Sequence, residues 1–571
     1  MKIKHLFGLA VLAAMTASCS SNDDLANNPG TGASETGVGY ATFSINLPTS
    51  SAGSRADAGG AEVAEGTKDE YAVKDATALI FQEEGTTESD YTFVESVDLG
   101  NLLWEKDDDT SSGITTKATK VAKLKNVSDN GKFYALILLN NKTASGEKVE
   151  LPTNGTTYKA WNDKVLENVD FASNGIFMAN APLLTGSEPA TLVNIKQGEI
   201  YTTKEAAEKA TSNTEIYVER GVAKVDVATP GTNGKIKVKE NNVETGDEVT
   251  FQKWALDVTN KKTFAVHYYS GLKGSYPEIW TKDRFKGLNK RIYWAQDPNY
   301  TNATLNAVDE SSDAARQKEF NYVSNSDVDV DFGTAKYCLE NTFDLNDMTQ
   351  GQTTRVVFKS VYKPKDCTEG ETFYKVSKTI VKNATDLKAL INKAAGEVLT
   401  GCTLKDEADL LTEGGVYLLK YTDLKFGTDE LDGTDTKKYN NNTQTGKEVA
   451  AAINAKLGLE GDENTRPEDI VGINTYKDGV TYYVARIKHF GDALTPWNVG
   501  EAYGSNNEKY LGRYGVLRNN WYSLSINSVS GLGYPDVPPT DPDMPDDENE
   551  KYISVSVKIL DWAKRSQSVD L

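Results

Sequence analysis

The chain has 571 residues, too many for one ordinary hydrophobic core, so two or three domains are expected. A formal charge of −21 leaves no dominant basic surface, which argues against nucleic acid as a partner. The 28 tyrosines, with Val/Ile/Thr runs between Gly, Asn and Asp, favour a mainly β protein. Beyond the first twenty residues no apolar run is long enough to cross a bilayer.

The amino terminus has the pattern of an export signal. Lys2 and Lys4 precede an apolar run and the small residues before Cys19, which predicts a signal peptide over residues 1–19. Cys19, directly after the small residues, resembles the cysteine of a bacterial lipobox. The resemblance implies cleavage before Cys19, acylation of that residue and a precursor anchored in the outer membrane. The alternative is an ordinary signal peptide with an incidental cysteine. Residues 20–24 (SSNDD) are similar to the acidic export tag of Bacteroidetes surface lipoproteins.

The next element is a predicted strand over Tyr40–Leu47, within a segment 20–55 that we interpret as a propeptide. Apolar residues alternate with polar ones, so one face carries Ala41, Phe43, Ile45 and Leu47. A loop of small residues follows and contains Arg55, then Ala56. Exposed loops of this composition are where proteases cut. A basic residue between a good strand and the rest of a domain therefore predicts a release site at Arg55–Ala56.

Two domains are expected after this site. Short strands over residues 76–82, 133–139 and 217–227 predict a β-sandwich over residues 56–230, with a short helix after Thr203 as N-cap. The run from Thr229 to Gly234 marks the boundary. Strands over residues 355–362, 479–487 and 521–529 define a second sandwich over residues 231–533. Helices over residues 385–395 and 447–457 are expected as insertions on this β frame.

The segment 534–571 combines a proline- and acid-rich stretch with a last strand over Tyr552–Trp562. The stretch is predicted to be an extended, solvated tether, because it has little apolar surface to bury. The strand has a strict period of two and needs a sheet to join. It either folds back on its own domain or enters that of a neighbour. The residues expected to act as a donor strand are Ile553, Val555, Val557, Ile559 and Trp562.

Catalytic signatures are missing from the sequence. His267 and His489 do not have zinc-ligand spacing, and no GxSxG, CxxC, P-loop or GxGxxG occurs. Nothing singles out two of the many carboxylates as a glycosidase pair. A weak calcium candidate is the alternation of Asp327, Asp329 and Asp331. Its glycine falls one position late for an EF-hand and Cys338 takes the place of the final glutamate, so a strand with its aspartates in water is the favoured interpretation. The mature chain would carry three cysteines, an odd number, so at least one is unpaired or forms an intermolecular bond.

Several segments together resemble one family. Residues 516–533 (VLRNNWYSLSINSVSGLG) are similar to the signature near the carboxyl terminus of Bacteroidetes type V fimbrillins, in particular shaft pilins of the minor-fimbria type. Residues 217–227 (YVERGVAKVDV) resemble the strand that closes their first domain. The acidic tether, the last strand, the lipobox and Arg55 follow in the family's order.

The resemblance implies two transthyretin-like β-sandwich domains and a lipoprotein precursor. It also implies that an arginine-specific protease cuts after Arg55, that the strand 40–47 leaves, and that the last strand of another subunit fills the groove. We therefore expect a structural subunit of a cell-surface fimbria that serves adhesion, with other fimbrial subunits as partners and no cofactor. The alternatives are a tip or accessory subunit, or a monomeric surface lipoprotein that binds glycans.

Overall fold

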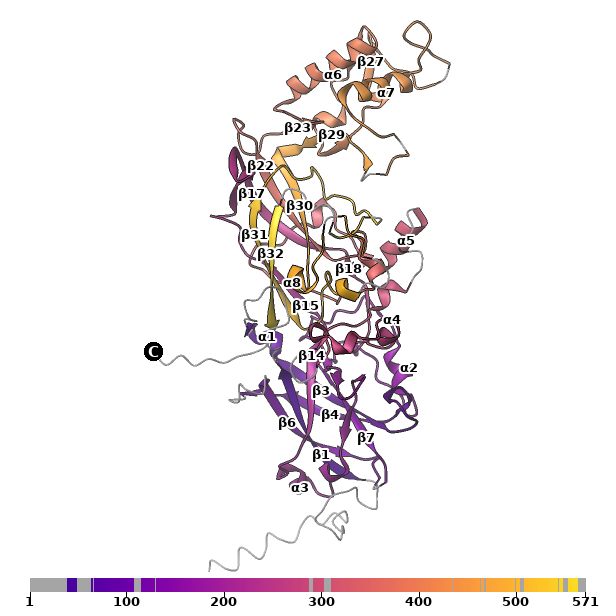
Figure 1. Cartoon of the computed structure of the whole chain (residues 1–571), viewed down its shortest axis with the longest axis vertical. Helices are drawn as coiled ribbons and strands as arrows, with labels where there is room; N and C mark the ends of the chain where they lie inside the picture. Colours follow the sequence, from indigo (N-terminus) through magenta and orange to yellow (C-terminus); the bar gives the residue numbers. More distant parts are fainter. Residues whose placement is uncertain are drawn as a thin grey trace, which may run out of the picture.

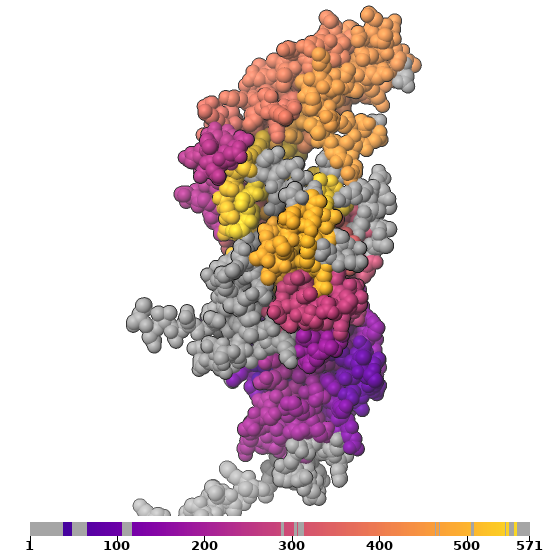
Figure 2. Space-filling model, viewed as in Figure 1, coloured from indigo at the N-terminus to yellow at the C-terminus, as the bar shows by residue number. Residues whose placement is uncertain are grey.

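The structure is a computed structural model that describes residues 38–48, 63–64, 66–106, 114–128, 130–286, 291–301, 305, 310–434, 436–462, 464–466, 469–498, 500–503, 508–542, 544–547 and 553–562. The molecule is elongated, with a first β-rich unit at one end, a second in the middle and a smaller lobe with helices at the other end (Figure 1). The space-filling view has the same outline (Figure 2). The predicted class, mainly β with short helices, is confirmed.

The first unit is a ten-stranded sheet that surrounds one hydrophobic core and buries a second cluster against its other face. Its main path runs β4-β3-β7-β9-β14-β1-β6-β5, with β12 on β7 and β13 on β1. Phe43, Ile80 and Ile137 are among the side chains that share the core. The alternation of apolar residues along each strand places them there. The strands are β1 (Gly39–Pro48), β3 (Val73–Gln82), β4 (Thr92–Leu102), β5 (Glu105–Lys106), β6 (Ile114–Leu124), β7 (Phe133–Leu139), β9 (Met178–Asn180), β12 (Val193–Ile195), β13 (Ile200–Tyr201) and β14 (Thr214–Arg220).

The second unit is a sandwich of two sheets on either side of another core. One sheet has the order β2-β32-β31-β15-β21 and the other β16-β17-β22-β30. Val225, Trp254 and Tyr522 meet between them. The strands are β2 (Val63–Ala64), β15 (Ala223–Val227), β16 (Lys235–Glu240), β17 (Val243–Asp257), β21 (Lys336–Cys338), β22 (Arg355–Lys363), β30 (Val480–Arg486), β31 (Asn520–Val529) and β32 (Ile553–Trp562).

The lobe is inserted between β22 and β30 and has its own core. Its helices α6 (Ala384–Val398) and α7 (Gly446–Leu457) confirm the predicted insertions. Asn383 caps α6, and a Thr445–Glu448 capping box begins α7. The lobe strands are β23 (Phe373–Val376), β24 (Thr379–Val381), β25 (Cys402–Leu404), β26 (Gly415–Tyr417), β27 (Leu424–Phe426), β28 (Asp429–Glu430) and β29 (Ile473–Tyr476).

The remaining helices and short strand pairs lie in the loops. None of the helices in the described ranges is both long and apolar enough to cross a membrane. The helices are α1 (Lys68–Tyr71), α2 (Tyr158–Asn162), α3 (Lys204–Glu208), α4 (Leu272–Ser275), α5 (Glu310–Glu319) and α8 (Gly491–Leu494), and the pairs are β10 (Leu183–Leu184) with β11 (Pro189–Ala190), β18 (Thr259–Asn260) with β20 (Phe320–Asn321) and β8 (Leu166–Glu167) with β19 (Lys262–Thr263).

The single strand predicted over residues 217–227 is two strands in the structure. β14 ends at Arg220 in the first sheet, and β15 begins at Ala223 in the second. Gly221 lies against aromatic rings, and a Cβ atom there would come within 2.7 Å of the Phe171 ring. The chain thus passes from the first sheet to the second at residues 221–222, ahead of the boundary predicted near residue 230.

The prediction of a solvated tether after residue 533 is wrong for the residues that the structure describes. Residues 534–542 and 544–547, here called the strap, lie along the second unit, and only Pro539 among them is largely exposed. Arginines far away in sequence pair with its carboxylates: Arg486 with Asp546 and Arg513 with Asp547. Composition alone did not reveal these partners, so a compact segment had the pattern of a disordered one.

Candidate strand-exchange site

The first predicted strand occupies an interior position in the first sheet. β1 pairs antiparallel with β6 along its whole length, from Gly39 opposite Leu124 to Pro48 opposite Ile114. On its other side it runs parallel to β14, and β13 pairs with its beginning. Both edges of β1 are therefore occupied by backbone partners, and its removal would leave β6 and β14 unpaired along a common slot.

The apolar face of β1 fills the core of the first unit. The side chains of Ala41, Phe43, Ile45 and Leu47 are all 0% exposed. The opposite face is also buried, which its polar sequence did not indicate. Helix α3 lies against the start of this face, where the Thr42 hydroxyl donates a hydrogen bond of 2.7 Å to the carbonyl oxygen of Ala207. β1 is thus buried on both faces.

The residues predicted for lipidation and processing, Cys19, Arg55 and Ala56, lie outside the described residues. The chain is described up to Pro48 in β1 and again from Val63 in β2, which pairs with the far end of β32 in the second unit. Helix α1 follows, and its buried Glu70 carboxylate lies 2.8 Å from Lys224 Nζ. Helix α1 contacts both units, because Arg220 Nε of β14 also donates to the Glu70 carbonyl oxygen, whereas β1 lies in the first sheet. A cut between β1 and α1 would remove the covalent link from β1 to the rest of the chain.

Few arginines in the described residues are open to a protease. Nine lie there; Arg284 and Arg466 are half-buried. The other seven are buried, several inside ion pairs, and cleavage needs an extended, accessible backbone. The buried residues are Arg220, Arg291, Arg316, Arg355, Arg486, Arg513 and Arg518.

The last predicted strand lies near the edge of its own sheet. β32 pairs antiparallel with β31, from Val529 opposite Ile553 to Asn520 opposite Asp561, and among the described residues only the two-residue β2 lies beyond it. Ile553 is 7% exposed and joins the core of the second unit, with Val555 half-buried beside it. The side chains of Val557, Ile559 and Trp562 lie outside the described residues. Of the two placements left open by the sequence, the structure has the tail on its own domain.

The calcium candidate residues do not converge. Asp327 accepts hydrogen bonds from the amide and hydroxyl of Ser324, and Asp331 forms an ion pair with Lys253 at 2.5 Å. Val328 and Val330 between them are buried, so the aspartates point to solvent. No group of three His, Cys, Asp or Glu in the described ranges is placed to hold a metal ion.

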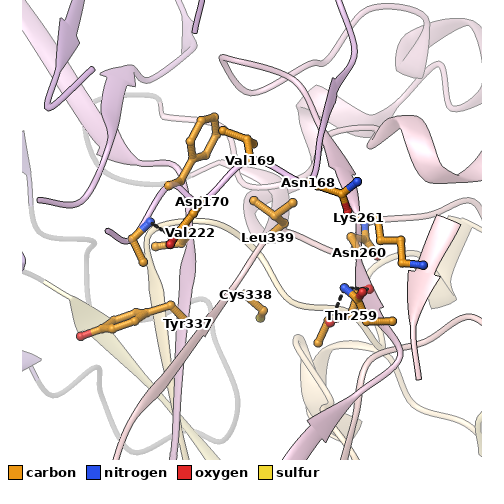
Figure 3. A pocket seen from close by; sticks show the side chains of 13 residues that line it. Asn168, Val169, Asp170, Val222, Thr259, Asn260, Lys261, Tyr337, Cys338 and Leu339 are labelled. Atoms are coloured by element: carbon orange, nitrogen blue, oxygen red, sulfur yellow. Dashed lines mark hydrogen bonds between the residues drawn. The ribbon is translucent and has the colours of Figure 1, made fainter. Parts of the chain in front are cut away.

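A cavity of about 280 Å³ lies between the two β units (Figure 3). Asp170 and Val222 from the first unit and Lys261 and Cys338 from the second are among its lining residues. Burial raises the pKa of the Cys338 thiol to about 12, so the thiol stays protonated at neutral pH and is a poor nucleophile. The three cysteines that the structure describes are all free.

The junction of the two units holds a buried charge cluster that we did not predict. His267 Nδ1 lies 3.1 Å from Glu219 and its Nε2 lies 3.2 Å from Glu340. Arg291 pairs with Glu219, and Arg518 pairs with Glu340 at 2.5 Å. Burial would raise the pKa of Glu219, but the charges of Arg291 and His267 outweigh it and lower the pKa to about 2.

A sequence signal for this junction existed in the two family-like segments. Glu219 and Arg220 belong to the segment 217–227, and Arg518 and Asn519 to the segment 516–533. The segments meet: the Arg220 amide donates to the Asn519 side-chain oxygen at 3.0 Å, and the Asn519 amide donates to the Val222 carbonyl oxygen at 2.8 Å. The residues that carried the resemblance are thus those that fasten the two units together.

Residues 474–568 match a family model described as "Major fimbrial subunit protein type IV, Fimbrillin, C-terminal". No curated protein matches the chain. Two solved structures from Parabacteroides distasonis ATCC 8503 are similar. One, described as a candidate cell adhesion protein, is 10% identical over 92% of this chain and 99% of its own, with a TM-score of 0.37. The other, a fimbrial assembly protein, is 9% identical over 57% and 86%, with a TM-score of 0.29. With TM-scores this low, neither structure supports a conclusion about the fold or function of this chain.

The family match assigns residues 474–568, which include β30, β31, the strap and β32, to a fimbrillin C-terminal domain. Proteins of the kind that this model describes are structural subunits of fimbriae at the cell surface. The family model is described as a major fimbrial subunit, whereas the sequence suggested the minor-fimbria type. The match therefore supports the fimbrillin class, and the particular type stays a prediction.

Proposed function

We propose that this chain is the structural subunit of a cell-surface fimbria, built by strand exchange between two transthyretin-like sandwich domains of successive subunits. The precursor is anchored to the outer membrane through Cys19. An arginine-specific protease cuts between Arg55 and Ala56, β1 leaves the first unit, and β32 of a neighbouring subunit enters the slot. The fimbria serves adhesion.

The observation that carries this proposal is the difference between the positions of the two strands. β1 lies between two long strands, β6 and β14, whereas β32 has one long partner and the two-residue β2. A strand that moves from the edge of one sheet to an interior slot of another gains a second full row of backbone hydrogen bonds. The exchange is therefore favourable for the donor even though it gives up its place on β31.

The emptied slot supplies the rest of the driving force. Phe43, Ile45 and Leu47 are fully buried, and each such side chain contributes roughly 1.5–3 kcal/mol of burial. Ile553, Val555, Val557 and Ile559 present the same alternation and can replace them. The slot and the donor are different surfaces, so each contact leaves a free slot and a free donor, and a filament grows.

Protection of the arginines in the described part of the chain supports selective processing. An arginine-specific protease would meet two half-buried arginines and seven buried ones in the described residues. Arg55 follows directly on a chain of small residues, where cleavage is easiest. A cut there would free β1 and leave both units intact.

One observation favours a second function, a monomeric surface lipoprotein that binds glycans. In the structure β32 completes its own sheet, as that function requires. A tip or accessory subunit would keep the slot and Arg55 as well, and differs only in its place in the fimbria.

The test uses residues 20–571, without the lipid, treated with a trace of arginine-specific protease. We expect heat-labile ladders on a gel and filaments by negative-stain microscopy, and a mature subunit that begins at Ala56. Arg55→Ala and a chain ending before Tyr552 should each remain monomeric. Arg466→Ala, which removes a half-buried arginine elsewhere, is the matched control and should assemble. A protein that is cut after Arg55 and stays monomeric would contradict the fimbrial subunit and favour the monomeric function.

A further inference from the structure

The strap is fastened to its own subunit by two aspartates whose side chains are buried, Asp546 and Asp547. Asp546 is 0% exposed; it accepts a hydrogen bond of 2.6 Å from the Thr353 hydroxyl and lies 3.2 Å from Arg486 Nε. Its amide donates to the carbonyl oxygen of Met348 at 3.2 Å. Each polar group named here has a partner on the body of the second unit.

Asp547 is held by a still denser set of contacts. Arg513 donates two parallel hydrogen bonds of 2.6 Å, from Nε and Nη2, to the two carboxylate oxygens. The hydroxyls of Tyr503 and Tyr514 add bonds of 2.8 and 2.9 Å. Bidentate pairing of a buried arginine with a carboxylate is among the strongest polar contacts in proteins. Burial would lower the pKa of Arg513, but the hydrogen bonds and charge of Asp547 outweigh it and raise that pKa.

The earlier part of the strap is tied down as well. Arg355 donates a hydrogen bond of 2.7 Å to the carbonyl oxygen of Pro538, and the Val537 amide donates to the Asn325 side-chain oxygen at 2.8 Å. The strap is thus bonded to the second unit from residue 537 to residue 547. β32, in contrast, has one long partner strand and lies near an edge.

We propose that the strap stays bound to its own subunit during assembly, so that a second copy of the chain receives only the residues from β32 onward. Asp547 is then the last residue that remains fixed on the donating subunit. The inference rests on the proposed function and goes beyond it, since it states which part of the tail moves. Five residues lie between Asp547 and Ile553, so the six Cα–Cα steps that join them span at most about 20 Å. The slot of the second copy must therefore lie within that distance of Asp547, and successive subunits must dock closely.

A pair of engineered disulfides tests this directly. Thr349 and Pro545 face each other, flanked by the bonds Gln350 N to Met544 O and Asp546 N to Met348 O. These bonds make them a close, non-hydrogen-bonded pair, whose Cβ spacing suits a disulfide. Thr349→Cys with Pro545→Cys locks the strap to the body.

The matched control locks the donor strand instead. Ser525 and Ser556 are opposite each other in β31 and β32, and both are exposed. Ser525→Cys with Ser556→Cys should hold β32 in place. Both double variants are made with Cys367→Ser, treated with trace protease, and run with and without reductant. The β32-locked protein should give ladders only after reduction, and the strap-locked protein should give them under both conditions.

A strap-locked protein that forms ladders only after reduction would overturn the inference. Hydrogen exchange on the unmodified protein gives an independent reading. Amides of residues 537–547 should exchange at rates within twofold of each other in monomer and fimbria, and their loss of protection in the fimbria would also overturn it. If the parent protein gives no ladders after cleavage at Arg55, the proposed function fails first and this inference with it.

Discussion

Replacement of Phe43 by alanine should weaken the precursor and leave the assembled fimbria unchanged. Phe43 is 0% exposed in the core of the first unit, and Phe→Ala at such sites costs about 3–5 kcal/mol. In a domain of this size the midpoint of thermal unfolding falls by roughly 2–4 °C per kcal/mol, so a drop of about 6–20 °C is expected. On the proposed mechanism, Phe43 has left the fimbria with β1, and β32 of a neighbour fills the slot.

The matched control is Phe81→Ala. Phe81 is also 0% exposed, but it belongs to β3, which stays in the subunit after cleavage. Circular dichroism of the uncut proteins should show similar losses for both variants. The temperature at which ladders dissociate should fall only for Phe81→Ala. If Phe43→Ala lowers that temperature as much, β1 remains in the fimbria and the exchange is refuted.

Three further predictions concern the junction and the thiols. Because the pKa of Glu219 is lowered to about 2, the stability that it supplies is present above its ordinary range and is lost as pH falls. The difference in the free energy of urea unfolding between the natural protein and Glu219→Gln should therefore narrow from pH 5 to 2.5, by up to roughly 3 kcal/mol; a constant difference would contradict this. Arg518→Met leaves the buried Glu340 carboxylate without its arginine and should cost about 3–5 kcal/mol in urea unfolding, and a loss under 1 kcal/mol would argue against the junction's role. Iodoacetamide at pH 7 should label the half-buried Cys367 and spare the other two thiols, as mass spectrometry will show; equal labelling would contradict the buried positions.

The two strands of the proposed exchange could be predicted from the sequence, because the alternation of apolar and polar residues lies within each short segment. A period of two places Phe43 and Ile45 on one face whatever the rest of the chain does, and the same holds for Ile553 and Val555. The alternation of apolar and polar residues did not predict that the polar face of β1 is buried as well. The hydroxyl of Thr42 has a polar partner in α3, 165 residues away, so a polar side chain is buried there.

The error over the strap has the same origin. Prolines and aspartates lower the apolar surface of a segment, and composition then predicts a solvated chain. Asp547 is buried because Arg513, Tyr503 and Tyr514 converge on it, and none of the three adjoins it in sequence. Long-range charge pairing is invisible to a local pattern. It is also the interaction that makes the strap strong enough to be an anchor.

The continuity of the segment 214–227 gives the proposed fimbria a path for tension. β14 borders the slot that the neighbour's β32 would fill, and it continues through residues 221–222 into β15, which pairs with β31. A pull on the incoming strand would thus pass to β14, then along covalent bonds into the second unit, and from there through the strap to the subunit's own β32. The buried pairs of Glu219 and Arg518 lie where this path crosses between units. A fimbrial subunit needs a stiff connection at that crossing, whereas a monomeric glycan-binding protein does not.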